Sequence, residues 1–310
     1  MGTAITVALV GTPELAKELG KKSTTSDVTL FHLVQDGHAI TIVEPTQYPE
    51  KFAPLLYALA LSDRVIFAVT ALDRSVAETA ATLDLIDLPV EVRHGPAVGP
   101  DELKRAFRGL RLVQAPFGPL DLLALREELQ EARVPPTPGP VLVGIDHYFP
   151  VKGVGTVALG IVRQGTLTVH SQLRLYPTTK VVEVRSVQVH DVDVHEAVTG
   201  ERVGVALKGV DVDELARGQF LAPEGALTVG TTLSGTAGRK CPYYRGDLVV
   251  GAQLQALVGA QLVPSLVSGL SGDTITVEAD RPVAYRPGQT LLLSDLSVPQ
   301  GPRCVARYTL

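Results

Sequence analysis

Four prolines within the six residues 135–140 (PPTPGP) divide the chain into two parts with different sequence patterns. Such a run forms neither a helix nor a central strand, because proline lacks the backbone N–H and fixes φ. It forms a stiff, extended connection instead. We therefore expect a linker over residues 135–140 and a separate domain over residues 1–134.

Before the linker, short β-branched runs alternate with segments of helical character. Strands are expected at residues 4–10, 38–43, 64–69 and 89–93. Helices are expected at residues 14–22, 49–61, 74–85, 101–107 and 121–133. Asp121 is expected to cap the last of these helices. This alternation predicts an α/β domain built on a doubly wound parallel sheet.

After the linker, the chain consists of short runs rich in Val, Leu and Thr that glycines interrupt. Helical periodicity is nearly absent there, which is typical of all-β barrels. A second break at residues 223–225 (PEG) predicts two such barrels. The expected fold class is therefore α/β followed by all-β, with barrels over residues 141–223 and 224–310.

The net charge of −5 comes from the N-terminal part. Residues 1–139 carry 13 basic and 18 acidic side chains, whereas residues 140–310 carry 15 of each. Without a basic excess, DNA is not an expected partner, although a local RNA site stays open. Apolar runs are far shorter than the ~20 residues of a membrane span. Two cysteines are too few for a disulfide framework, so we expect a reduced, cytoplasmic protein with no membrane partner.

The turn after the first expected strand is where a phosphate loop, G-x-x-x-x-G-K-[ST], would lie. Residues 11–18 have the sequence GTPELAKE. Gly11 and Lys17 match that pattern, but Ala16 replaces the second glycine. Glu18 stands at the position of the hydroxyl that holds magnesium. An ordinary strand-to-helix turn is therefore favoured over a working phosphate site.

Two further groups are candidate RNA contacts. Lys21 and Lys22 stand beside three hydroxyl side chains, although a solvated loop is the simpler interpretation. Residues 239–245 (RKCPYYR) mix basic and aromatic side chains, as an RNA-facing loop does, with a solvated hairpin tip as the alternative. The candidate residues there are Arg239, Lys240, Tyr243 and Arg245.

The segment after the linker resembles a known family. The stretches VGIDHYF, VKGVGTV, AVTGERVG and LKGV, which begin at residues 143, 151, 197 and 207, have the order and spacing of the second domain of the elongation factor Tu superfamily. Within it, the Asp146-His147 pair is most similar to the selenocysteine-specific elongation factor. Residues 226–310 resemble a trimmed third domain. The whole resembles an archaeal-type paralogue with a degenerate P-loop GTPase-like domain.

This resemblance implies an aminoacyl-tRNA pocket in the first barrel. In the selenocysteine-specific family an acidic residue, a histidine and an arginine at these places surround the selenol of the charged tRNA. The matching residues are Asp146, His147 and Arg202. An arginine and a protonated histidine suit an anionic selenolate. The alternatives are a barrel-surface ion pair for Arg202 and a strand-start cap for His147.

The same resemblance implies that the machinery for hydrolysing GTP is lost. Residues 40–50 (ITIVEPTQYPE) fall where these GTPases carry D-x-P-G-H. Glu44 replaces the magnesium-linked aspartate, Gln47 the glycine that senses the γ-phosphate, and Tyr48 the histidine that orients water. The guanine-reading N-K-x-D motif is absent, since residues 92–95 are VRHG. These losses together argue against GTP or magnesium as a cofactor.

Three functions stay open on the sequence. The first is a pseudo-GTPase without catalytic residues or cofactor, which binds aminoacyl-tRNA, the ribosome or another translation factor. The second is an atypical but active GTP-binding factor that delivers aminoacyl-tRNA, selenocysteyl-tRNA included. The third is a protein-binding module outside translation. No metal site is expected, because the histidines lack ligand spacing, and His190 and His195 read as parts of a barrel loop.

Overall fold

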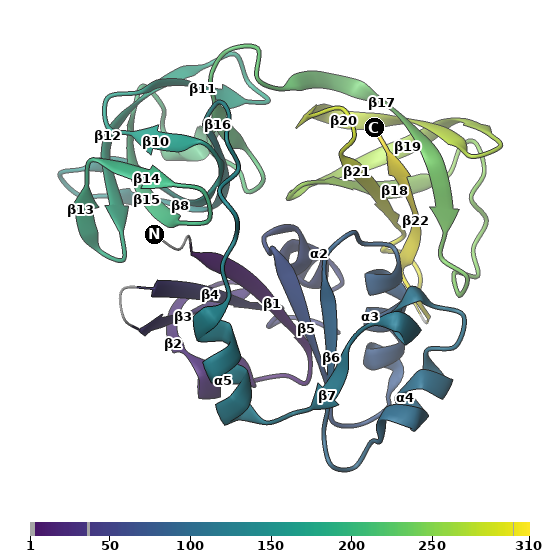
Figure 1. Cartoon of the computed structure of the whole chain (residues 1–310). Helices are drawn as coiled ribbons and strands as arrows, with labels where there is room; N and C mark the ends of the chain where they lie inside the picture. The colour runs from purple at the N-terminus through teal and green to yellow at the C-terminus, as the bar shows by residue number, and fades with distance from the viewer. Residues whose placement is uncertain (1–3, 36–37, 300) are drawn as a thin grey trace.

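The computed structural model describes residues 4–35, 38–299 and 301–310 (Figure 1). It contains an α/β domain followed by two β-barrels, so the expected fold class is confirmed. Figure 1 shows both barrels above the α/β domain, the first on the left beside β1 and the second on the right beside α3.

The α/β domain is built on a seven-stranded sheet in the order β2-β3-β4-β1-β5-β6-β7. Its parallel strands are β1 (Ile5–Gly11), β4 (His38–Glu44), β5 (Arg64–Val69), β6 (Val90–His94) and β7 (Phe117–Pro119). The edge hairpin of β2 (Lys21–Thr25) and β3 (Thr29–Gln35) runs antiparallel. The sheet is therefore mixed, whereas the sequence predicted a parallel one.

The helices are α1 (Ala16–Leu19), α2 (Ala53–Ala60), α3 (Arg74–Asp84), α4 (Pro100–Ala106) and α5 (Leu122–Glu131), with a 3-10 turn at η1 (Arg111–Gln114). Asp121 caps α5 as expected, because its carboxylate accepts from the backbone N–H groups of Leu123 and Ala124. The first helix is shorter than predicted. It ends at Leu19 because the next residues pair with β3 as a strand.

The first barrel closes in the order β11-β16-β8-β9-β15-β12. Its strands are β8 (Leu142–Val151), β9 (Gly155–Gln164), β11 (Gln172–Tyr176), β12 (Val181–Val189), β15 (Arg202–Lys208) and β16 (Phe220–Ala222). Shorter elements accompany them: β10 (Thr166–Thr168), β13 (Val192–Val194), β14 (Glu196–Val198) and the 3-10 turn η2 (Val212–Glu214).

The second barrel closes in the order β17-β20-β19-β18-β21-β22. Its strands are β17 (Thr228–Lys240), β18 (Gln253–Val258), β19 (Gln261–Ser271), β20 (Thr274–Tyr285), β21 (Thr290–Ser294) and β22 (Cys304–Thr309). The barrels approach closely at Gly218, whose φ is +88°. A Cβ there would lie 2.4 Å from the backbone oxygen of Ala260, so this contact requires glycine.

Arginines of both barrels pair with carboxylates of the α/β domain. We call the five of them the docking arginines, and they make the pairs Arg163–Asp63, Arg217–Asp27, Arg239–Asp84, Arg303–Glu78 and Arg307–Asp87. The acidic excess of the α/β domain is thus partly used to hold the barrels, since opposite charges meet at each contact.

Apolar packing accompanies the ion pairs at the second barrel. Leu257, Leu292, Cys241 and Cys304 of the second barrel belong to the same buried cluster as residues of α3. This interface therefore continues the core of the α/β domain, as a permanent interface does. No helix in the described part of the chain is long and apolar enough to cross a membrane.

We predict that Arg303→Ala destabilises the protein by about 3 kcal/mol, because it leaves a buried carboxylate without its counter-charge. The Glu78 side chain is 7% exposed, and one of its oxygens lies 2.6 Å from the Arg303 guanidinium. Urea denaturation measures this loss. Arg307→Ala, on β22 just after Arg303, is the matched control and should cost less than about 1 kcal/mol, because its partner Asp87 is half exposed. Equal losses would contradict the prediction.

Candidate functional site

The turn that follows β1 packs against the end of β5. Gly11 has φ +101°, and a Cβ at this position would lie 2.1 Å from the backbone oxygen of Ala68. The backbone N–H of Thr12 donates to that same oxygen at 2.8 Å. Ala16, which replaces the second glycine of a phosphate loop, is fully buried beneath the sheet's hydrophobic cluster. The start of the turn therefore requires glycine at position 11, whereas position 16 is packed into the core.

The lysine of this turn is held by a carboxylate of the same turn. Lys17 Nζ lies 2.8 Å from Glu14 Oε2. Glu14 has φ +61°, a backbone conformation that residues with a Cβ seldom adopt. Glu18 is exposed on the same helical turn. The charge that would neutralise phosphate is thus already paired, and further negative charge lies beside it.

Glu44 lies at the end of β4, facing the same turn. Its side chain is buried, and its Oε1 has no hydrogen-bond partner among the described residues. Burial raises the pKa of Glu44, while the backbone N–H groups of Glu14 and Leu15 oppose that rise. The carboxylate therefore faces backbone amides that a phosphate loop would offer to phosphate.

Gln47 and Tyr48, which follow β4, form hydrogen bonds with other parts of the α/β domain. The Tyr48 hydroxyl donates to the backbone oxygen of Ser75 at 2.8 Å and accepts from Thr79 Oγ1 at 3.2 Å, so it lies against α3. Burial raises the pKa of Tyr48. The backbone N–H of Gln47 donates to the backbone oxygen of Asp27 at 3.1 Å. The Tyr48 hydroxyl is therefore occupied by two contacts with α3.

The structure brings Asp146, His147 and Arg202 together. Arg202 Nη2 donates to Asp146 Oδ1 at 2.6 Å, and His147 Nδ1 lies 2.7 Å from the same oxygen. Asp146 is 1% exposed and Arg202 is 8% exposed. Burial alone would raise the pKa of Asp146, but Arg202 and His147 outweigh it and hold the pKa below its ordinary value.

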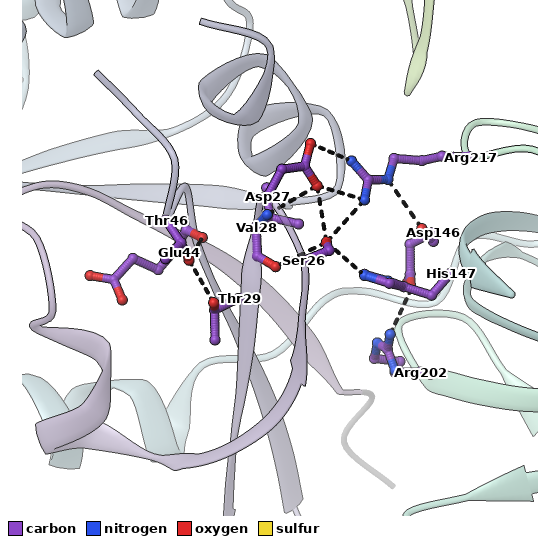
Figure 2. Close-up of polar contacts among 10 residues, drawn as sticks. All are labelled: Ser26, Asp27, Val28, Thr29, Glu44, Thr46, Asp146, His147, Arg202 and Arg217. Atoms are coloured by element: carbon purple, nitrogen blue, oxygen red, sulfur yellow. Dashed lines mark hydrogen bonds and ion pairs between the residues drawn. The ribbon is translucent and has the colours of Figure 1, made fainter. Parts of the chain in front are cut away.

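The β2–β3 turn of the α/β domain covers this trio, as Figure 2 shows. Ser26 Oγ lies 3.1 Å from His147 Nε2. Arg217 bridges the two sides: its guanidinium donates to Ser26 Oγ at 3.2 Å, to Asp27 Oδ2 at 3.0 Å and to the backbone oxygen of Asp146 at 3.2 Å. The trio therefore lies at a domain interface, with the Ser26–His147 contact between the α/β domain and the first barrel.

Two buried polar atoms of this interface have no hydrogen-bond partner within residues 4–35, 38–299 and 301–310. Asp146 Oδ2 and Arg202 Nε are buried, and neither has a hydrogen-bond partner among the described residues. Most buried polar groups are paired, so this acceptor and this donor, on two residues that pair through other atoms, need an explanation. A ligand group that both donates and accepts would complete them.

Two histidines belong to the same region. His32 of β3 and His190, which follows β12, meet edge to face with ring centroids 5.6 Å apart. Burial, followed by the charge of Arg202 and by His190, lowers the pKa of His32 to about 4, although Asp146 and Asp191 act in the opposite direction. The sequence did not indicate His32, Ser26 or Asp27 as site residues, because no local pattern marks a contact between domains.

The candidate RNA contacts lie in two separate places. Lys21 and Lys22 are exposed on β2, at the free edge of the sheet. Lys240 and Arg245 are exposed at the end of β17 and just beyond it. Figure 1 shows these two elements on opposite sides of the molecule.

Two residues of the second group contact the α/β domain. Arg239 pairs with the buried Asp84. The Tyr243 hydroxyl donates to the backbone oxygen of Arg108 at 2.9 Å. Within the described ranges, no group of three or more His, Cys, Asp or Glu side chains could hold a metal ion.

Comparison with known proteins places these residues in a family context. The family "Elongation factor Tu domain 2" matches residues 155–222. An uncharacterized protein of Methanocaldococcus jannaschii is 36% identical over 294 residues, which cover 94% of this chain and 95% of that protein. The selenocysteine-specific elongation factor of Mus musculus is 34% identical over 152 residues, 49% of this chain and 26% of that protein.

A solved structure shares the whole fold. Translation elongation factor SelB from Methanococcus maripaludis, in complex with the GTP analogue GppNHp, matches with a TM-score of 0.80 and 20% identity. The match covers 100% of this chain and 79% of that one. The arrangement of an α/β domain and two barrels is therefore shared with a protein that was solved with a bound GTP analogue.

We predict that stability falls by about 2 kcal/mol between pH 6.5 and pH 4 because of His32. The pKa of His32 is lowered to about 4 in the folded protein. Between pH 6.5 and pH 4, the His32 imidazole therefore binds a proton in the unfolded chain but stays largely neutral in the folded protein. This difference favours unfolding. Urea denaturation across the window measures the effect.

His32→Gln should flatten this pH dependence, because glutamine does not titrate. His195→Gln is the matched control, since His195 is exposed, and it should leave the profile unchanged. A wild-type profile that is flat over this window, or equal profiles for His32→Gln and wild type, would refute the prediction.

Proposed function

Because the chain belongs to the superfamily of elongation factor Tu and the selenocysteine-specific elongation factors, we propose that it is a translation factor-like protein that works without GTP. Its barrels bind aminoacyl-tRNA, and its α/β domain serves as a scaffold that hydrolyses nothing. The observation that carries this proposal is the phosphate turn, where Lys17 is paired with Glu14 and the carboxylate of Glu44 faces the amides.

The charges around the turn oppose a triphosphate. An incoming nucleotide would meet Glu14, Glu18 and Glu44, and Lys17 would have to leave the Glu14 carboxylate, 2.8 Å away, to reach it. Glu18 stands where magnesium needs a hydroxyl ligand. Helix α1 has only four residues, so its terminal amides and dipole contribute little. These features support a turn that is stable without nucleotide.

The interface between the α/β domain and the first barrel is the reason for proposing aminoacyl-tRNA as the partner. The open acceptor of Asp146 and the open donor of Arg202 lie beside His147 and His32. An aminoacyl group carries an ammonium donor and a carbonyl acceptor, which match these two atoms. On this proposal, the tRNA end enters when the β2–β3 turn moves away from His147.

The alternative of an atypical but active GTP-binding factor rests on Gly11 and Lys17 alone. Gly11 ends β1 with φ +101°, and Lys17 lies in the short helix α1. Calorimetry separates the two functions. We predict no saturable heat when millimolar GTP or GDP is titrated with Mg²⁺ into the full chain.

The matched variant for this titration is Lys17→Ala. Saturable one-to-one binding by the wild-type protein that Lys17→Ala abolishes would establish the alternative and reject our proposal. Glu44→Gln provides a second check. If Glu44 blocks the turn, removing its charge should raise any residual nucleotide affinity, and it should not lower it.

For the partner, we predict that the double variant Lys21→Ala, Lys22→Ala binds tRNA more weakly. Both lysines are exposed at the edge of the sheet, beside the β2–β3 turn that covers Asp146, His147 and Arg202. The plot of log affinity against log salt concentration should become shallower, with the magnitude of its slope smaller by about 1–2, since each phosphate contact contributes roughly 0.7–0.9. Filter binding at several salt concentrations measures this slope.

Lys104→Ala is the matched control for the RNA experiment. This lysine is exposed on α4, at the opposite side of the α/β domain from β2. It should leave both affinity and slope unchanged. Crosslinking in the native host, followed by sequencing, gives the direct readout: recovery of neither tRNA nor ribosomal RNA would favour a protein-binding role outside translation.

A further inference from the structure

The chain's two cysteines meet at the face of the second barrel that contacts the α/β domain. Cys241 follows β17, and Cys304 begins β22. These strands are neighbours, and the backbone N–H of Cys241 donates to the backbone oxygen of Val305 at 2.8 Å. The two Sγ atoms lie 3.4 Å apart, although 63 positions separate them in the sequence. The barrel topology therefore creates a dithiol that the sequence alone does not reveal.

The two thiols have different surroundings. Cys304 is fully buried, and its S–H donates to Cys241 Sγ. This hydrogen bond, supported by the N–H groups of Tyr243 and Tyr244, lowers the pKa of Cys241 to about 7. The same contact and burial raise the pKa of Cys304. At neutral pH, Cys241 is therefore the nucleophile and Cys304 the partner that retains its proton.

A cavity of about 1050 Å³ lies beside the pair, between the α/β domain and the second barrel. Its lining includes Pro242 and Tyr243, which follow Cys241, and Arg303, which precedes Cys304. Cys241 itself is 4% exposed. Neither cysteine lines the cavity itself, so a molecule as small as hydrogen peroxide would reach Cys241 only when residues 242–244 move aside.

We propose that Cys241 and Cys304 form a dithiol that hydroperoxides convert reversibly into a disulfide. The Cys241 thiolate attacks one oxygen and breaks the O–O bond, which gives a sulfenic acid on Cys241. The other oxygen leaves as hydroxide from hydrogen peroxide, or as alkoxide from an organic hydroperoxide, and is protonated to water or an alcohol. The sulfur of Cys304 then attacks Cys241 Sγ, and its proton leaves with the sulfenic hydroxyl as water. The two sulfurs lose two electrons in total, and the peroxide gains both. A dithiol reductant reverses the change.

The geometry requires little rearrangement for this step. The sulfurs must close from 3.4 Å to the bond length of about 2.05 Å. Two docking arginines flank the pair: Arg303 adjoins Cys304 and binds Glu78, and Arg239 lies two positions before Cys241 and binds Asp84. The disulfide therefore forms close to the two ion pairs that join the second barrel to α3.

The first test uses the full-length wild-type protein. One equivalent of hydrogen peroxide should lower the intact mass by about 2 Da and remove both thiols from alkylation in denaturant, and dithiothreitol should restore them. The rate of thiol loss should rise with pH through a midpoint near the pKa of Cys241, about 7. Thiols that stay fully alkylatable, or a mass gain with no loss of the second thiol, would overturn the proposal.

Two variants assign the roles of the cysteines. Cys304→Ser should accumulate one sulfenic acid on Cys241, trapped as a single dimedone adduct that peptide mapping locates. Cys241→Ser should react at least about 10-fold more slowly, because the remaining thiol is buried and protonated. Circular dichroism and thermal melts check that both variants fold. Equal rates in the two variants, or dimedone on Cys304, would contradict the assignment.

Discussion

Ion pairs between the docking arginines and the α/β domain determine how the three domains sit together. Glu78 shows the constraint most clearly, because its carboxylate is buried and both of its oxygens accept from Arg303. A buried carboxylate without such a partner would be strongly destabilising. On the other side, Arg217 holds Asp27 and so keeps the β2–β3 turn over Asp146. The acidic side chains of the α/β domain and the arginines of the barrels therefore act together, because each docking arginine pairs with one of those carboxylates.

Charge pairing within the chain also characterises the turn that follows β1. Lys17 is satisfied by Glu14, and the amides near Glu14 face the carboxylate of Glu44. In a nucleotide-binding protein, the corresponding lysine and backbone N–H groups donate to phosphate oxygens. Here the chain supplies its own anions, although Glu44 Oε1 is itself buried without a hydrogen-bond partner among the described residues. At the Asp146–Arg202 interface, two further buried polar atoms have no partner in the part of the chain that the structure describes.

Much of the fold could be predicted from local pattern. β5 (Arg64–Val69) has the bounds that its apolar run indicated, and Asp121 caps its helix. The edge hairpin could not be predicted, because Lys21–Thr25 is polar and exposed and becomes a strand only by pairing with β3. The grouping of Asp146 with Arg202 followed from the family resemblance. The pairing of Arg239 with Asp84, 155 positions apart, depends on the packing of domains, which no local pattern records.

The most direct test of this account is a crystal structure of the protein soaked with a millimolar non-hydrolysable GTP analogue and Mg²⁺. The account predicts no nucleotide density at the turn, with Lys17 still on Glu14, Glu44 still buried and Arg303 still bound to Glu78. Density for a triphosphate at the amides of Glu14 and Leu15, with the Glu44 carboxylate displaced, would contradict it.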